Sequence, residues 1–226
     1  MQKYYKHNIR FIRIIKSLLC KFQKFYILNL NLKLSQYLCC FLNERENKIG
    51  LKGAKGLGKG LGKNFNLKIL NLNLKNNNIG DEGASELFEG LGGCSSLVNL
   101  TLDLSGTNNL VNDSTSQMVT GQGKCQNLKF LKLNLLYDNY LSDEGIDGLG
   151  IGLESCKSLS SLIIDLQAYF TIYDEIHQGL GKRLKNHQNL TCLTLNLTEP
   201  MNFNKEELNK RLQKMKRLVY KYIKFS

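Results

Sequence analysis

A strand-like pattern of alternating apolar and polar residues recurs along the chain. The copies start at Phe25, Leu67, Leu97, Leu128, Leu159 and Leu190, with a weaker one at Leu218, and from Leu67 to Leu190 the intervals are 30, 31, 31 and 31 residues. Alternation with a period of two is typical of a β-strand with one buried face. The sequence therefore predicts one strand in each unit of about 31 residues.

Leucines spaced four residues apart lie between these strands. Leu57 and Leu61 precede the strand at Leu67, and Leu87 and Leu91 precede the next strand. Residues at i and i+4 share one face of a helix, so each unit is predicted to run strand, turn, helix. A single unit of this size cannot bury its own apolar faces, whereas stacked units share a core, as in a solenoid.

The segments between strand and helix share a motif. Residues 77–84 match N-x-(I/L)-x-D-x-G-(A/V), residues 139–146 follow it, and residues 47–54 lack only its Asp, while the third and fifth units depart further. On these motifs the chain resembles leucine-rich repeat proteins of the ribonuclease-inhibitor type over about residues 24–226. The resemblance implies a right-handed α/β solenoid, a horseshoe of about six repeats of ~31 residues with a parallel concave sheet and helices outside.

Each motif residue has a physical reason for its position. The Asn is expected to satisfy backbone groups at the corner after the strand, from one unit to the next. The Asp suits the positive end of the helix dipole, and the Gly allows close approach of the neighbouring backbone.

The stretch GAKGLGKGLGK at residues 53–63 has the glycine and lysine spacing of a phosphate-binding loop. Such a loop needs Ser or Thr after the Lys, but Gly60 follows Lys59. The repeat register instead predicts a helix with Leu57 and Leu61 buried and the lysines outside. We therefore expect no nucleotide or other cofactor here.

The repeat register divides the chain into three parts. Residues 1–24 are predicted to form a basic capping helix, residues 25–217 the repeat domain, and residues 218–226 a capping strand. Residues 35–46 have no counterpart in the other units and are interpreted as an insertion. An extra helix, a partner-binding loop and a mistranslated intron all remain open as its explanation.

Charge and cysteine content narrow the class of protein. The 226 residues carry a net charge of +12, and residues 1–43 and 205–226 are strongly basic. Basic ends attract acidic proteins, nucleic acid or anionic membranes, and they also keep a protein in solution. Seven cysteines, no signal-peptide pattern and no long apolar run predict a cytoplasmic protein without a transmembrane segment.

No residues are spaced as a catalytic or metal site would require. Cys94, Cys125 and Cys156 share one repeat column, which Asn64, His187 and Met215 complete. Without C-x-x-C or similar spacing, this column is predicted to hold stacked buried side chains rather than metal ligands. We therefore expect neither an enzyme nor a small-molecule substrate.

The outward strand positions are the predicted partner site, because leucine-rich repeat proteins usually bind on the concave face. The predicted contact residues are Asn71, Asn73, Thr101, Asp103, Phe130, Lys132, Asn134, Asp165, Thr194 and Asn196. An asparagine ladder that simply solvates the sheet is the alternative interpretation of these rows.

The function predicted from these features is a non-enzymatic scaffold that binds a protein partner. One alternative is that the basic ends bind RNA or an anionic membrane surface. Another is that the chain is the repeat segment of a larger protein, for example a kinase-linked or regulatory one.

Overall fold

The computed structural model describes residues 38–43, 47–106, 126–136, 143–166, 180–185, 187–197 and 217–225, together with the single residues 206, 210, 212, 213 and 215. The predicted capping helix at 1–24 and the predicted strand starting at Phe25 lie outside these residues. Cys125 also lies outside them.

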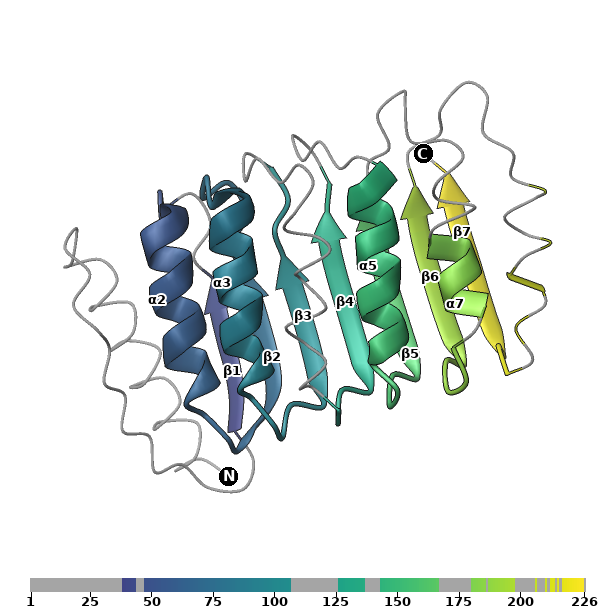
Figure 1. The fold of residues 1–226 in the computed structure, drawn as a ribbon, viewed down its shortest axis with the longest axis horizontal. Helices are drawn as coiled ribbons and strands as arrows, with labels where there is room; N and C mark the ends of the chain where they lie inside the picture. Colours follow the sequence, from purple (N-terminus) through teal and green to yellow (C-terminus); the bar gives the residue numbers. More distant parts are fainter. Residues whose placement is uncertain are drawn as a thin grey trace.

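In the described part of the chain, seven strands form one parallel sheet in the order of the sequence (Figure 1). They are β1 (Leu38–Asn43), β2 (Leu67–Asn73), β3 (Asn99–Asp103), β4 (Phe130–Leu135), β5 (Ser161–Leu166), β6 (Cys192–Leu197) and β7 (Tyr220–Phe225). Each strand pairs in parallel with the strand that follows it in the sequence. The predicted α/β class with a parallel sheet is confirmed.

The helices lie in a layer along one face of this sheet (Figure 1). They are α2 (Gly50–Gly62), α3 (Gly80–Gly92), α5 (Asp143–Ser155) and the short α7 (Lys182–Lys185). Within the described ranges, no helix or strand covers the other face, which we call the open face. The core lies between the layers, where strand leucines such as Leu70 and Leu100 join helix leucines such as Leu87 and Leu149.

Strand pairing places equivalent residues side by side on the open face. The first row is Asn71, Thr101, Lys132, Ile163, Thr194 and Tyr222; the second is Asn73, Asp103, Asn134, Asp165 and Asn196; the third is Ile69, Asn99, Phe130, Ser161, Cys192 and Tyr220. The first two rows were predicted to begin at Asn29 and Asn31. The pairing from Asn71 to Thr194 and from Asn73 to Asn196 is confirmed, but Phe41 and Asn43 of β1 pair with Asn71 and Asn73 in place of the predicted residues.

The position of the first strand corrects the sequence analysis. β1 lies inside residues 35–46, which were interpreted as an insertion without a counterpart, and its Phe41 pairs with Asn71 exactly one 30-residue interval later. The interpretation is therefore wrong for Leu38–Asn43. These residues form a short apolar run without alternation, which also fits a strand.

The corner after β2 depends on the buried Asn77. Its Oδ1 accepts hydrogen bonds from the amides of Asn47, at 3.0 Å, and Ile49, at 3.3 Å, and its Nδ2 donates to the carbonyl of Lys75 at 3.2 Å. The Asn77 carbonyl also accepts from the amide of Gly50. The predicted role of this Asn, which was to satisfy backbone groups of the adjacent unit, is confirmed here.

The turns that lead into α2 and α3 repeat one backbone conformation. Lys48 and Asn78 have φ angles of 52° and 51°, and two residues later Gly50 and Gly80 have 59° and 71°. Each pair is 30 residues apart, so the turn recurs with the strand. Asp81 lies in the first turn of α3, as its place in the motif predicts.

Glycines allow α2 and α3 to pack at backbone distance. A Cβ added at Gly90 would lie 2.5 Å from the Cα of Gly58, and one added at Gly93 would lie 2.6 Å from the carbonyl oxygen of Gly62. Residues 53–62 are helical, so the expectation of a helix rather than a phosphate-binding loop is confirmed.

Ion pairs also connect neighbouring helices. Lys55 of α2 pairs with Glu86 of α3. Arg183 of α7 holds both carboxylate oxygens of Asp147 in α5, with nitrogen to oxygen distances of 3.2 Å.

Replacing Gly90 by alanine tests the helix contact. Gly90→Ala should lower the free energy of unfolding by about 1–3 kcal/mol, because the added methyl overpacks the contact with Gly58. The matched change Gly60→Ala, where no atom lies within 4 Å of the new Cβ, should raise it by about 0.5–1 kcal/mol. Urea unfolding followed by circular dichroism measures both, and equal effects of the two changes would contradict the close packing.

Changes at Asn77 test the corner. Asn77→Ala leaves buried amides without an acceptor and should cost about 2–3 kcal/mol of stability. Asn77→Asp keeps the accepting oxygen and should cost less. The exposed Asn66 serves as control, since Asn66→Ala should stay within about 0.5 kcal/mol in the same unfolding experiment.

Candidate functional site

All ten predicted contact residues lie on the open face. Nine belong to the first and second rows, and Phe130 belongs to the third. Along β3, β4 and β6, buried residues that face the helices alternate with these outward residues. The three rows therefore form the candidate site, and they differ in what their side chains are free to do.

The second row uses its side-chain oxygens within the chain. Asn73 Oδ1 accepts from the amide of Lys75 at 3.0 Å, Asp103 Oδ1 from that of Ser105 at 2.9 Å, and Asn134 Oδ1 from that of Leu136 at 3.1 Å. An Asn or Asp that accepts from the amide two residues later forms a local turn. Asn73 and Asp103 are the last residues of their strands, and Asn134 is the last but one of β4. The recurrence of Asn and Asp in this row therefore has a structural cause.

Asp165 anchors a polar cluster across three strands. Its side chain accepts a hydrogen bond from Asn196 Nδ2, and its other oxygen lies 3.9 Å from Lys132 Nζ. Asp165 is only 7% exposed, whereas Lys132 remains partly exposed. The pairing compensates the charge of the buried carboxylate and holds Lys132 over β4 and β5.

Apolar and aromatic side chains gather in the third row and at β7. Ile69 is 36% exposed, Tyr220 is 53% exposed, and Tyr222 of the first row is 46% exposed. Phe130 was predicted on this face, but Ile69, Tyr220 and Tyr222 were not included in the site. Continuing the alternation two residues before the first row identifies Ile69, and extending the rows onto β7 identifies Tyr220 and Tyr222.

In the column after the helices, Cys94, Cys156, His187 and Met215 are buried as predicted, whereas Asn64 is only half-buried. Cys94 Sγ donates to the carbonyl of Leu61 at 3.2 Å. Burial raises the pKa of Cys94 to about 12 and that of Cys156 to about 11, so both thiols stay protonated at neutral pH. Among the residues that the structure describes, no three His, Cys, Asp or Glu side chains are grouped to hold a metal ion.

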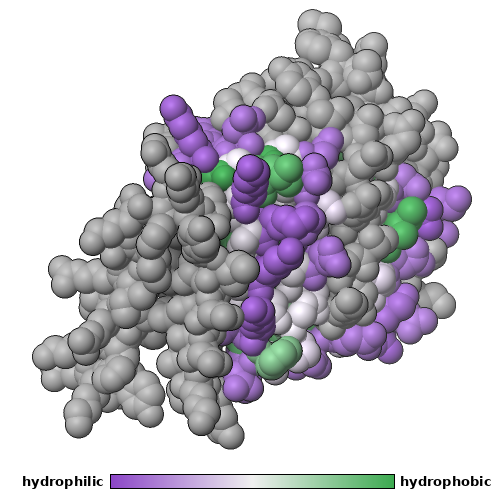
Figure 2. Space-filling model, turned by 60° about the vertical axis from the view of Figure 1, so that its left-hand side comes forward, coloured by the Kyte–Doolittle hydropathy of each residue, from purple (hydrophilic) through white to green (hydrophobic). Residues whose placement is uncertain are grey.

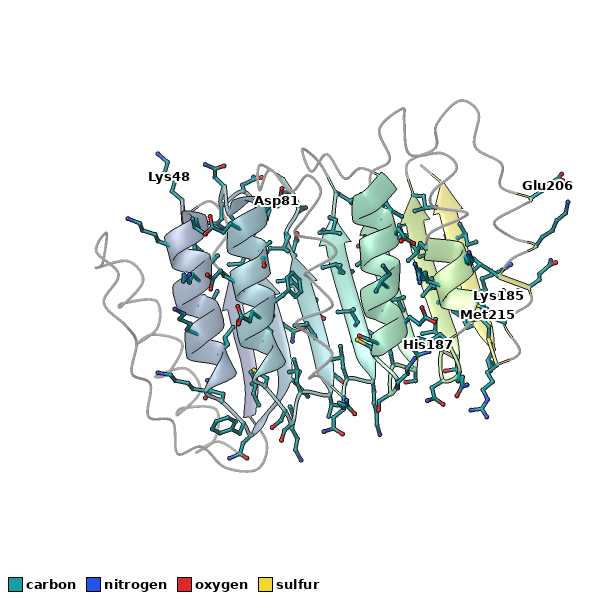
Figure 3. The ribbon with its side chains drawn as sticks, in the orientation of Figure 1. Lys48, Asp81, Lys185, His187, Glu206 and Met215 are labelled. Carbon is teal, nitrogen blue, oxygen red and sulfur yellow. The ribbon has the colours of Figure 1, made fainter. Side chains whose placement is uncertain are left out.

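His187 lies on the opposite edge of the molecule from Lys48 and Asp81 (Figure 3). Its Nε2 is 3.0 Å from the carbonyl oxygen of Cys156, and its Nδ1 accepts from the Asn189 amide at 3.4 Å. This arrangement fits a neutral ring with the proton on Nε2. Burial lowers the pKa of His187 below its usual value; the Cys156 carbonyl opposes this effect, Lys157 adds to it and Glu154 opposes it.

The lowered pKa of His187 predicts how the stability of the protein depends on pH. The stability that the neutral ring contributes is present above the unfolded pKa of about 6.5 and is lost as the pH falls through the lower folded value. His187→Cys places in this unit the residue that Cys94 and Cys156 supply in theirs, and it should reduce the loss of stability between pH 7.5 and pH 5. Parallel urea unfolding at both pH values measures the difference, and an identical loss in the two proteins would refute the assignment.

Comparisons with known proteins add no family to this description. A scan of the sequence against models of protein families finds no match, and a search of curated proteins finds no similar sequence. None of the helices in the described part of the chain has the length and apolar character needed to cross a bilayer.

Proposed function

We propose that this protein is a leucine-rich repeat solenoid that binds a protein partner on the open face of its sheet, without enzymatic activity. The observation that carries the proposal is the uncovered parallel sheet whose outward residues stand in rows. A partner that contacts such a surface meets side chains already fixed in position by the backbone, which reduces the entropy lost on binding.

The constant spacing of the rows supports the solenoid. Along the first row, Asn71, Thr101, Lys132, Ile163 and Thr194 are separated by 30, 31, 31 and 31 residues. The buried corner at Asn77 and the contact between Gly58 and Gly90 join adjacent units by the same interval of 30 to 32 residues. These features favour about six stacked repeats of one design.

The first and third rows are the better candidates for contact. Asn73, Asp103 and Asn134 of the second row already accept backbone hydrogen bonds. The aromatic residues Phe130, Tyr220 and Tyr222 have the chemistry of interface hot spots, and they lie beside polar neighbours that stay partly exposed. We therefore expect a partner that offers apolar side chains together with an acidic group for Lys132.

The alternatives from the sequence remain predictions. Binding of RNA or an anionic membrane by the basic ends concerns segments that lie mostly outside the described residues. A role as the repeat segment of a larger protein, with kinase-linked or regulatory activity elsewhere, is compatible with the same fold, and a cytoplasmic location is likewise a prediction.

Phe130→Ala is the direct test of the open face. It should weaken binding to a partner isolated by affinity capture at least about tenfold, because a buried aromatic anchor contributes more than about 1 kcal/mol. The matched control is Ile151→Ala, which removes an apolar side chain that is 41% exposed on α5 in the helix layer, and it should leave the dissociation constant unchanged. Titration by surface plasmon resonance measures both, and a loss limited to Ile151→Ala would reject the open face as the site.

A further inference from the structure

Five lysines form a continuous stripe along α2. They are Lys48, Lys52, Lys55, Lys59 and Lys63, at successive spacings of 4, 3, 4 and 4 residues. In a helix of 3.6 residues per turn and 1.5 Å rise, Lys52, Lys55, Lys59 and Lys63 lie on one face over about 16 Å. We call this face the lysine ridge. Lys48 lies in the turn before this helix. Figure 2, turned toward the α2 end of the molecule, shows a band of hydrophilic residues parallel to the helix axes.

The charge of the lysine ridge is largely uncompensated. Lys52, Lys59 and Lys63 are exposed, and within the described ranges no acidic side chain forms an ion pair with any of them. Among the residues that the structure describes, Lys55 is the one ridge lysine in an ion pair, with Glu86 of α3. Residues 47–80 contain no Asp or Glu at all.

This arrangement works against the stability of α2. Lysines three and four residues apart repel one another, and Lys52 lies at the positive end of the helix dipole without an acidic residue in the first turn. The repeat does not require these charges, because the positions of Lys52 and Lys59 are occupied one unit later by Glu82 and Glu89. A local conflict with stability that the fold does not impose is typical of a functional surface.

Two glycines leave one flank of the ridge without side chains. Gly56 is exposed, and a Cβ at Gly60 would meet no atom within 4 Å. Unlike Gly58 and Gly90, Gly60 has no packing reason to lack a side chain. Because glycine has no side chain, an extended chain can lie close to the helix backbone beside the lysines.

An exposed aromatic ring stands at the end of the ridge. Phe65 follows Lys63 by two residues and is 65% exposed. It lies between Asn64, which donates to the carbonyl of Gly60, and the exposed Asn66. Lysines that follow a phosphate backbone, combined with an aromatic face for stacking, are the elements with which proteins bind single-stranded nucleic acid.

We propose that the lysine ridge and Phe65 bind a single strand of nucleic acid along α2. A flat anionic membrane fits less well, because it would also meet the exposed Glu82 and Glu89 on the neighbouring α3. An acidic peptide would use the lysines but gives the exposed ring no base on which to stack. The proposal is independent of partner binding on the open face.

Binding of a fluorescein-labelled oligouridylate of 15 nucleotides, followed by fluorescence anisotropy, tests the ridge. The triple variant Lys52→Gln, Lys59→Gln, Lys63→Gln should bind at least tenfold more weakly in 100 mM KCl. The slope of log K against log salt concentration should fall by about 2, since each phosphate contact on a single strand contributes about 0.7. The matched control neutralises the exposed Lys129, Lys157 and Lys185, which lowers the net charge from +12 to +9 as well, and it should change affinity less than twofold.

Phe65→Ala separates stacking from charge. It should weaken binding of the single strand about 5- to 100-fold, leave a 15-base-pair duplex nearly unaffected, and be rescued by Phe65→Tyr. Equal losses in the two triple variants would overturn the proposal. So would binding to phosphatidylserine vesicles or polyglutamate that depends on the ridge more strongly than binding of the oligouridylate does.

Discussion

The backbone hydrogen bonds between successive units are the constraint on which the rest of this structure depends. At the start of the strands, the amide of Val98 donates to Lys68, that of Ser160 to Lys129, and that of Thr191 to Ser160, each at 2.9 Å. These bonds stay in phase only if each unit adds 30 or 31 residues. A slip by one residue would turn the buried leucines to the open face and the polar rows into the core. The same interval between units therefore fixes the packing of the core, the turn at Asn77 and the rows of the open face.

This spacing also explains the glycines of α2 and α3. Neighbouring strands lie about 4.8 Å apart, whereas packed helices are usually 8–10 Å apart. If every strand is followed by a helix, the mismatch can be resolved in two ways. The sheet can curve so that the helices move apart, or the helices can pack more closely where glycines replace larger residues. Gly58, Gly62 and Gly90 provide the second solution, because their backbones meet where a Cβ has no room. The stretch at residues 53–63 that resembles a phosphate-binding loop therefore uses its glycines to pack α2 against α3.

Much of the fold follows from the sequence because register and burial have the same period. The strands from Leu67 to Leu197 and their rows were predictable, since each leucine pattern states both which residues pair and which face is buried. β1 was not predictable, because a short apolar run without alternation fits a buried strand and a buried helix segment equally well. The role of Asn73, Asp103 and Asn134 as acceptors of backbone hydrogen bonds was not predictable, because Asn and Asp are equally compatible with a binding surface and with a turn. Three-dimensional contacts alone show that their oxygens are already used.

The two candidate surfaces differ in whether their lysines have an acidic partner. Lys132 on the open face lies beside Asp165 of the next strand, and Lys55 on α2 meets Glu86 of the next helix, so each is balanced by the following unit. Lys52 and Lys59 face outward. Glu82 and Glu89, at the matching positions of α3, face outward as well, and within the described residues they form no ion pair with these two lysines. The net charge of the chain cannot distinguish these cases. Because the open face belongs to the sheet and the lysine ridge to the helix layer, the two proposed ligands would not compete for the same surface.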